Sequence, residues 1–76
     1  MPPITPAELK RRREALGFKQ LELAERFGVH EMTVSKWERG KHSIPEMVDL
    51  ALRTLETERA VQARSLLADQ MAESSP

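Results

Sequence analysis

A chain of 76 residues without cysteine, in which 12 basic side chains balance 12 acidic ones, predicts one small domain of zero net charge. The lack of cysteine excludes disulfide bridges and thiolate metal sites and suits a reducing cytoplasm, where we expect the protein to act. No apolar run reaches the roughly 18 residues of a membrane span, and the N-terminus has no signal-peptide pattern, so we expect no membrane partner.

The first predicted helix covers residues 5–16. A capping box with proline at the first helical position starts this helix, in the sequence Thr5-Pro6-Ala7-Glu8. Gly17 marks its end, because a residue with positive φ commonly follows a helix. Leu9 and Leu16 should point inward, and residues 1–4 are expected to be disordered.

Two short amphipathic segments follow, and a glycine separates them. Leu23, Ala24 and Phe27 have helical spacing before Gly28, and Val34 and Trp37 have it afterwards. We therefore predict helices over residues 20–27 and 31–38, the second ending before Gly40. Two helices joined by so short a turn cross at a steep angle, which is the helix-turn-helix geometry. That geometry leaves one face of the second helix free to enter a DNA major groove.

The last helical region begins at a second predicted capping box, Ser43-Ile44-Pro45-Glu46. Residues 46–73 contain neither glycine nor proline, so they form either one long helix or two helices with a pause near 54–58. Several apolar residues there are available for burial: Met47, Val48, Leu50, Ala51, Leu52 and Leu55. The predicted fold is an all-α, compact bundle of four to five helices over residues 5–57, with a C-terminal helical extension over residues 58–73.

The charges are unevenly distributed along the chain. Residues 10–41 contain nine Lys or Arg against five Glu, whereas residues 46–76 contain three Arg against six acids. Such a chain folds into a polarised molecule in which only the first half suits phosphate groups. Chance segregation on solvated helix surfaces would give the same counts, so charge alone does not decide for nucleic acid.

Residues 13–55 resemble the XRE, or Cro-like, helix-turn-helix family of lambdoid phage repressor type. The residues that carry the resemblance are Gln20, Leu23, Ala24, Gly28, Val29, Thr33, Val34, Ser35, Trp37, Glu38, Arg39, Gly40 and Pro45. The resemblance implies binding of double-stranded DNA by a small transcription regulator. No cofactor is implied, and no arrangement of residues points to an enzyme or to a metal site.

The resemblance implies base contacts from three side chains on the second of the two short helices, Glu31, Met32 and Lys36. A lysine can donate to guanine O6 and N7, a glutamate can accept from cytosine N4, and a methionine can pack on a thymine methyl. The alternative is an ordinary solvated helix face. Glu31 also brings a negative charge close to the DNA, which costs affinity unless it meets a cytosine.

A second set of residues is expected to contact phosphates: Lys19, Gln20, His30, Thr33, Arg39, Lys41 and His42. Gln20 opens a helix whose N-terminal N–H groups favour anions. His30 stands where the family prefers Ser or Thr as helix N-cap. Arg13 and Glu38 are a different case, because the resemblance implies that they form a partly buried ion pair joining the first helix to the third.

The C-terminal extension suggests how two copies associate. Family operators are typically palindromic and read by dimers. The extension has apolar residues in helical phase, namely Val61, Leu66, Leu67 and Met71. It is expected to pair with a second copy, and the alternative is that it folds back on its own core. The predicted function is thus a small dimeric repressor or autorepressor. The alternative is the antitoxin half of a toxin–antitoxin pair, whose C-terminal half binds a partner protein.

Overall fold

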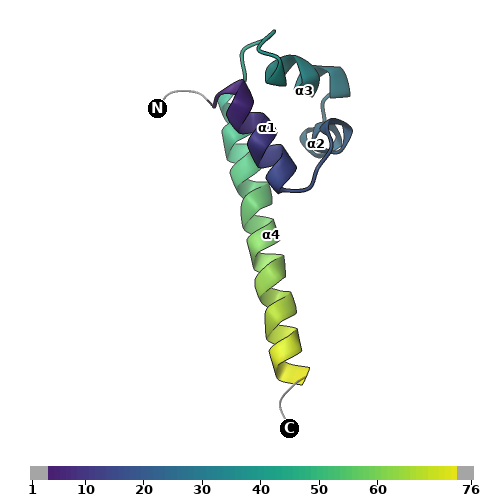
Figure 1. Cartoon of the computed structure of the whole chain (residues 1–76), viewed down its shortest axis with the longest axis vertical. Helices are drawn as coiled ribbons and strands as arrows, with labels where there is room; N and C mark the ends of the chain where they lie inside the picture. Colours follow the sequence, from purple (N-terminus) through teal and green to yellow (C-terminus); the bar gives the residue numbers. More distant parts are fainter. Residues whose placement is uncertain (1–3, 74–76) are drawn as a thin grey trace.

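Four helices and no strand make up the part of the chain that the structure describes, which is the backbone of residues 4–73 and the side chains of residues 4–68. In this computed structural model (Figure 1) the helices are α1 (Pro6–Ala15), α2 (Gln20–Phe27), α3 (Glu31–Glu38) and α4 (Glu46–Glu73). The all-α prediction is confirmed. Within these residues no helix is long and apolar enough to cross a membrane.

The ends of the short helices follow from their sequence. The Thr5 hydroxyl oxygen accepts a hydrogen bond of 3.1 Å from the Glu8 backbone N–H, and Pro6 occupies the first turn of α1. Gly28 ends α2 with φ of 69°, a conformation in which a β-carbon is strained. The next N–H, from Val29, donates to the Ala24 carbonyl over 2.9 Å. The chain therefore turns at Gly28 and Val29, and His30 is already the N-cap of α3.

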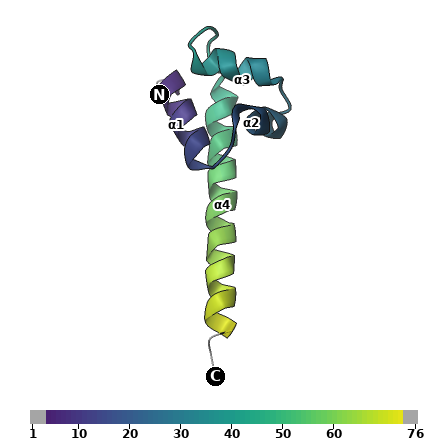
Figure 2. The same cartoon turned by 45° about the vertical axis from the view of Figure 1, so that its right-hand side comes forward.

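One hydrophobic core joins all four helices, with α1, α2 and α3 packed around the first half of α4 (Figure 2). Its buried apolar side chains are Ile4, Leu9, Leu23, Ala24, Val34, Trp37, Ile44, Val48 and Leu52. The expectation that residues 1–4 are disordered is wrong for Ile4, which is buried in this core, while residues 1–3 lie outside the described part. Burial of Ile4 anchors the chain ahead of α1.

Two of the apolar residues expected to be available for burial on α4 are exposed. Met47 is 77% exposed and Leu50 is 62% exposed, whereas Val48 and Leu52 are buried. Each residue turns an α-helix by about 100°, so Leu50 lies on the side of α4 that faces away from Val48. Only one face of α4 can meet the core, and the other face keeps its apolar residues in water.

The start of α4 also differs from the prediction. The helix begins at Glu46 and not within the Ser43 capping box, and the Val48 N–H donates to the Pro45 carbonyl over 3.0 Å. Pro45 therefore precedes the helix, and Ser43 is too far from the first turn to cap it. Downstream, α4 continues without the pause that was considered near residues 54–58.

The second half of α4 projects away from the other three helices (Figure 1). The molecule therefore measures 57 Å along its longest axis. Val61, Leu66 and Leu67 are all more than half exposed, so this segment does not fold back on its own core. The side chain of Met71 lies outside the described residues. The second half of α4 is thus an exposed helical arm that carries apolar side chains.

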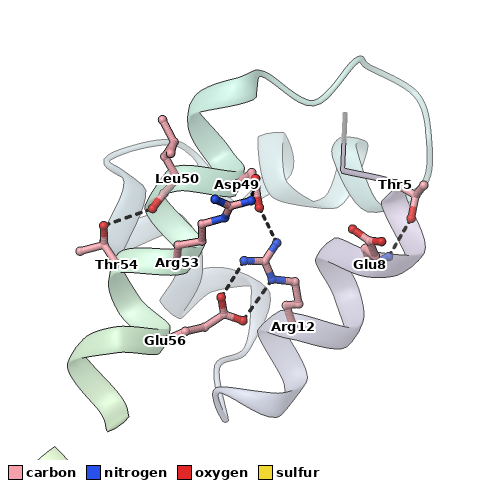
Figure 3. Close-up of polar contacts among 8 residues, drawn as sticks. All are labelled: Thr5, Glu8, Arg12, Asp49, Leu50, Arg53, Thr54 and Glu56. Carbon is pink, nitrogen blue, oxygen red and sulfur yellow. Dashed lines mark hydrogen bonds and ion pairs between the residues drawn. The ribbon is translucent and has the colours of Figure 1, made fainter. Parts of the chain in front are cut away.

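An ionic cluster that the sequence analysis missed joins α1 to α4 (Figure 3). The Arg12 guanidinium donates to both carboxylate oxygens of Glu56, over 2.6 and 3.1 Å, and to Asp49 over 2.6 Å. Arg53 adds a contact of 3.1 Å to Asp49. Hydrogen bonding to Arg12 lowers the pKa of both carboxyl groups below their usual range, and the bond to Glu56 raises the pKa of Arg12. Two carboxylates of the acidic C-terminal half therefore bind to α1.

This cluster predicts a pH dependence of stability. Because the pKa values of Asp49 and Glu56 are lowered on folding, their contribution is complete above the ordinary carboxyl pKa of roughly 4 and is lost as the pH falls through the lowered values. We expect Glu56→Gln to reduce the free energy of unfolding by about 1 kcal/mol or less at pH 7, since the pair is partly exposed. In urea titrations the difference from the parent chain should shrink at pH 3.

Glu25→Gln is the matched control, because Glu25 is an exposed acid on α2 that makes none of these contacts with Arg12. It should change stability much less than Glu56→Gln at pH 7. Equal effects of the two variants at both pH values would contradict the role assigned to the Arg12 cluster.

Candidate nucleic-acid interface

The third helix is held in one rotational position by the side chains that it buries. Val34 is fully buried and Trp37 is 7% exposed, so this side of α3 faces the core. Glu31 and Met32 lie on the outer side and are exposed, and Lys36 on the next turn is half-buried. Figure 1 shows α3 at one end of the molecule, opposite the C-terminal end of α4. The outer face of α3 is thus open to a large ligand.

A buried ion pair connects α1 to α3. The Arg13 guanidinium donates to the two Glu38 carboxylate oxygens over 2.7 and 3.0 Å, and to the Phe18 carbonyl over 2.8 Å. The side chains of Arg13 and Glu38 are only 10% and 4% exposed. Hydrogen bonding to Glu38 raises the pKa of Arg13. The carboxylate of Glu38 is therefore engaged inside the protein and is not part of the outer face of α3.

Gln20 extends this pair to α2. Its side-chain amide nitrogen donates to a Glu38 oxygen over 3.2 Å. Three helices thus meet at one carboxylate, and no buried side-chain nitrogen or oxygen among the described residues lacks a partner. The contact turns the Gln20 side chain towards Glu38, so a phosphate role for this residue depends on the N–H groups at the start of α2. Next to it, the Lys19 N–H donates to the Glu22 carboxylate over 2.9 Å.

His30 is the N-cap of α3. Its Nδ1 accepts a hydrogen bond of 3.0 Å from the Met32 N–H, and its carbonyl accepts one of 2.9 Å from the Thr33 N–H. An imidazole nitrogen that accepts carries no proton, so the proton of the neutral ring is on Nε2. The histidine therefore supplies the acceptor that Ser or Thr would provide, and the exposed ring stands beside the first turn of α3.

The structure brings Arg39 onto the same face as Met32. The Arg39 Nη2 lies 3.9 Å from the Met32 sulfur, and its Nε donates to the Ser35 carbonyl over 3.4 Å. Arg39 directly follows α3, in agreement with the predicted helix over residues 31–38, and it was expected to contact phosphates. The signal that would have found its position beside Met32 is the helical spacing 32, 35 and 39, which places all three residues on one side.

The remaining predicted residues surround this face. Lys19 precedes α2, and Thr33 on α3 is half-buried. Lys41 and His42 are exposed in the loop after α3, where the Lys41 N–H donates to the Lys36 carbonyl over 2.9 Å. No group of three or more His, Asp or Glu side chains among the described residues could hold a metal ion. The arrangement offers hydrogen-bond donors, one carboxylate and one thioether to a ligand.

Comparison with known proteins identifies this geometry. A family model described as Helix-turn-helix matches residues 9–56, which is more than half of the chain and includes α2 and α3. No curated protein and no solved structure matches the chain. The matched range contains Arg13, Gln20 and Glu38, and it contains the whole outer face of α3.

The buried pair gives a prediction for stability. Arg13→Ala and Glu38→Ala should each destabilise the fold by about 3–5 kcal/mol, because each leaves an uncompensated buried charge. The double variant should lose clearly less than the sum of the two, as expected for residues in direct contact. Urea titration of the four chains measures this coupling, and additive losses would show that the pair does not act as a unit.

Proposed function

Because the chain belongs to the XRE-type helix-turn-helix family of DNA-binding transcription regulators, we propose that it binds a specific double-stranded sequence through the outer face of α3. We further propose that it acts as a homodimer on a palindromic operator and represses its own or a neighbouring operon. The observation that carries the proposal is the outer face of α3, which presents exposed groups on a helix fixed by the Arg13–Glu38 pair.

The side chains of this face suit the edges of bases in a major groove. Lys36 is proposed to donate to guanine, Glu31 to accept from cytosine N4, and Met32 to pack on a thymine methyl. Arg39, whose guanidinium lies beside the Met32 sulfur, can reach the same groove. Glu31 next to phosphates weakens non-specific binding. Its proposed contribution is therefore discrimination between bases.

Phosphate contacts are proposed around the edge of this face. The first N–H groups of α2 attract an anion, with Lys19 beside them. On the other side, Lys41 and His42 are exposed in the loop after α3, and His30 and Thr33 stand at its start. Such contacts fix the orientation of the protein on the duplex and carry no sequence information.

The proposed dimer follows from the small size of one helix-turn-helix. A single α3 contacts few base pairs, and two copies related by a two-fold axis read two half-sites about 34 Å apart. A protein bound over a promoter excludes other proteins from it, which is the proposed route to repression. The alternative proposal, an antitoxin whose α4 binds a different protein, would use the same exposed arm. Self-association of the pure chain favours the regulator, because it occupies that arm.

Selection of bound duplexes from random DNA, followed by two lysine variants, tests the proposal. Lys36→Ala should weaken binding to the selected duplex by about 1–3 kcal/mol and relax the preference at one position in each half-site. Lys41→Ala is the control in the phosphate-contacting loop. It should weaken selected and random duplexes alike and reduce the salt dependence of affinity by about one charge. Fluorescence anisotropy measures both.

Two outcomes would contradict the assignment. If Lys36→Ala weakens selected and random duplexes equally, Lys36 contacts phosphate only. If selection enriches no sequence at all, the chain does not bind DNA specifically and the proposed function fails.

A further inference from the structure

An uncharged stripe runs along the side of α4 that faces away from the core. It consists of six exposed residues, Leu50, Thr54, Thr57, Val61, Ser65 and Ala68. Residues 50–68 include five charged side chains, and none of them falls on this stripe, which begins after the exposed Glu46. Val48 and Leu52, on the other side of the helix, are buried in the core. The stripe extends from beside the core onto the projecting arm.

We infer that this stripe is where α4 of a second copy packs, parallel to the first, so that both α3 helices lie at the same end of the pair. The inference rests on the proposed dimeric function and specifies its interface. It differs from pairing through residues 58–73 alone, because the contact begins at Leu50, within the part of α4 that covers the core.

The spacing of the stripe suits two long helices packed side by side. Its residues are separated by four, three, four, four and three positions, so the pattern repeats after 11 residues. An 11-residue repeat corresponds to about 3.67 residues per turn, close to a straight α-helix, so the stripe stays on one side along its length. The Thr54 hydroxyl already donates to the Leu50 carbonyl over 3.1 Å (Figure 3), which leaves its methyl group for packing.

The charges on either side of the stripe favour the parallel orientation. Arg53, which contacts Asp49 of its own helix and is still 56% exposed, lies along one edge. Glu58, five residues later, is exposed along the other. In a parallel two-fold pair, opposite edges of the two helices meet, as at the e and g positions of a coiled coil. Each Arg53 then faces Glu58 of the second copy. In an antiparallel pair, the edge that carries Arg53 would instead meet the same edge of the second copy. In the sequence the same spacing recurs as Arg64 and Asp69.

The position of α3 requires the same orientation. The C-terminal end of α4 and helix α3 lie at opposite ends of the long axis in both views of the molecule (Figures 1 and 2). Parallel packing brings the two α3 helices to one end, where they can face a single duplex. Antiparallel packing across Val61 would send them to opposite ends of the pair, so one duplex would meet only one of them.

Cysteine cross-linking tests the orientation directly, because the parent chain contains no cysteine. Thr54→Cys and Ala68→Cys each place one thiol on the stripe, 14 residues apart. Ala63→Cys is the matched control, since Ala63 is exposed on the same arm but lies off the stripe. The full chain is oxidised mildly at micromolar concentration and separated without reductant.

A parallel pair should convert both stripe variants to a covalent dimer, each by itself, and leave the control variant monomeric. No antiparallel register allows both positions to meet their own copies. An antiparallel pair across Val61 would instead link Thr54→Cys to Ala68→Cys only when the two variants are mixed. That result, or cross-linking of the control alone, or no covalent dimer of either stripe variant, overturns the inference.

DNA binding by the same preparations separates this test from that of the proposed function. A chain that binds duplex DNA while neither stripe variant cross-links refutes the parallel pair and leaves the DNA-binding proposal standing. Cross-linking of both stripe variants in a chain that does not bind DNA supports the pair and refutes the proposed function.

Discussion

The buried ion pair between Arg13 and Glu38 is the constraint on which the outer face of α3, the proposed DNA-binding surface, depends. It joins α1 to α3, and Gln20 adds α2 to the same carboxylate. Two short helices of eight residues each have little stability of their own. Their mutual angle is therefore set by what they bury, and a hydrogen-bonded charge pair allows fewer arrangements than apolar packing does. The direction in which α3 presents Glu31, Met32 and Lys36 follows from this pair together with the burial of Val34 and Trp37.

Zero net charge does not argue against nucleic acid here, because the structure separates the charges. The positive charge of Arg12 is paired with Asp49 and Glu56 where α1 meets α4. That contact neutralises two acids of the C-terminal half, and Glu58 lies further along α4, away from α3 (Figure 1). Lys19, Lys36, Arg39 and Lys41 remain around the outer face. The local field at this face thus differs from the average over the chain.

Local sequence patterns predicted most of the helix-turn-helix. The features that they did not predict depend on tertiary contacts. Helical spacing and Gly28 are sufficient for α2 and α3, so Val34 and Trp37 were placed correctly in the core. Ile4 was missed because it precedes any periodic segment and is buried only by contact with distant residues. The Arg12 cluster spans 37 and 44 residues of sequence, so no local pattern reveals it. Arg39 follows α3 as predicted, but its contact with Met32 depends on the conformations of two side chains, which the sequence does not specify.

The central claim is that the outer face of α3, held by α1 and α2, meets DNA. Titration of the isotope-labelled chain with a duplex, followed by backbone amide NMR, tests it most directly. We expect the largest shift changes at the start of α2, along α3 and in the loop at Lys41 and His42, with little change around Arg12 and Glu56. Changes confined to α4, or no change on α3 when the duplex is bound, would contradict the account.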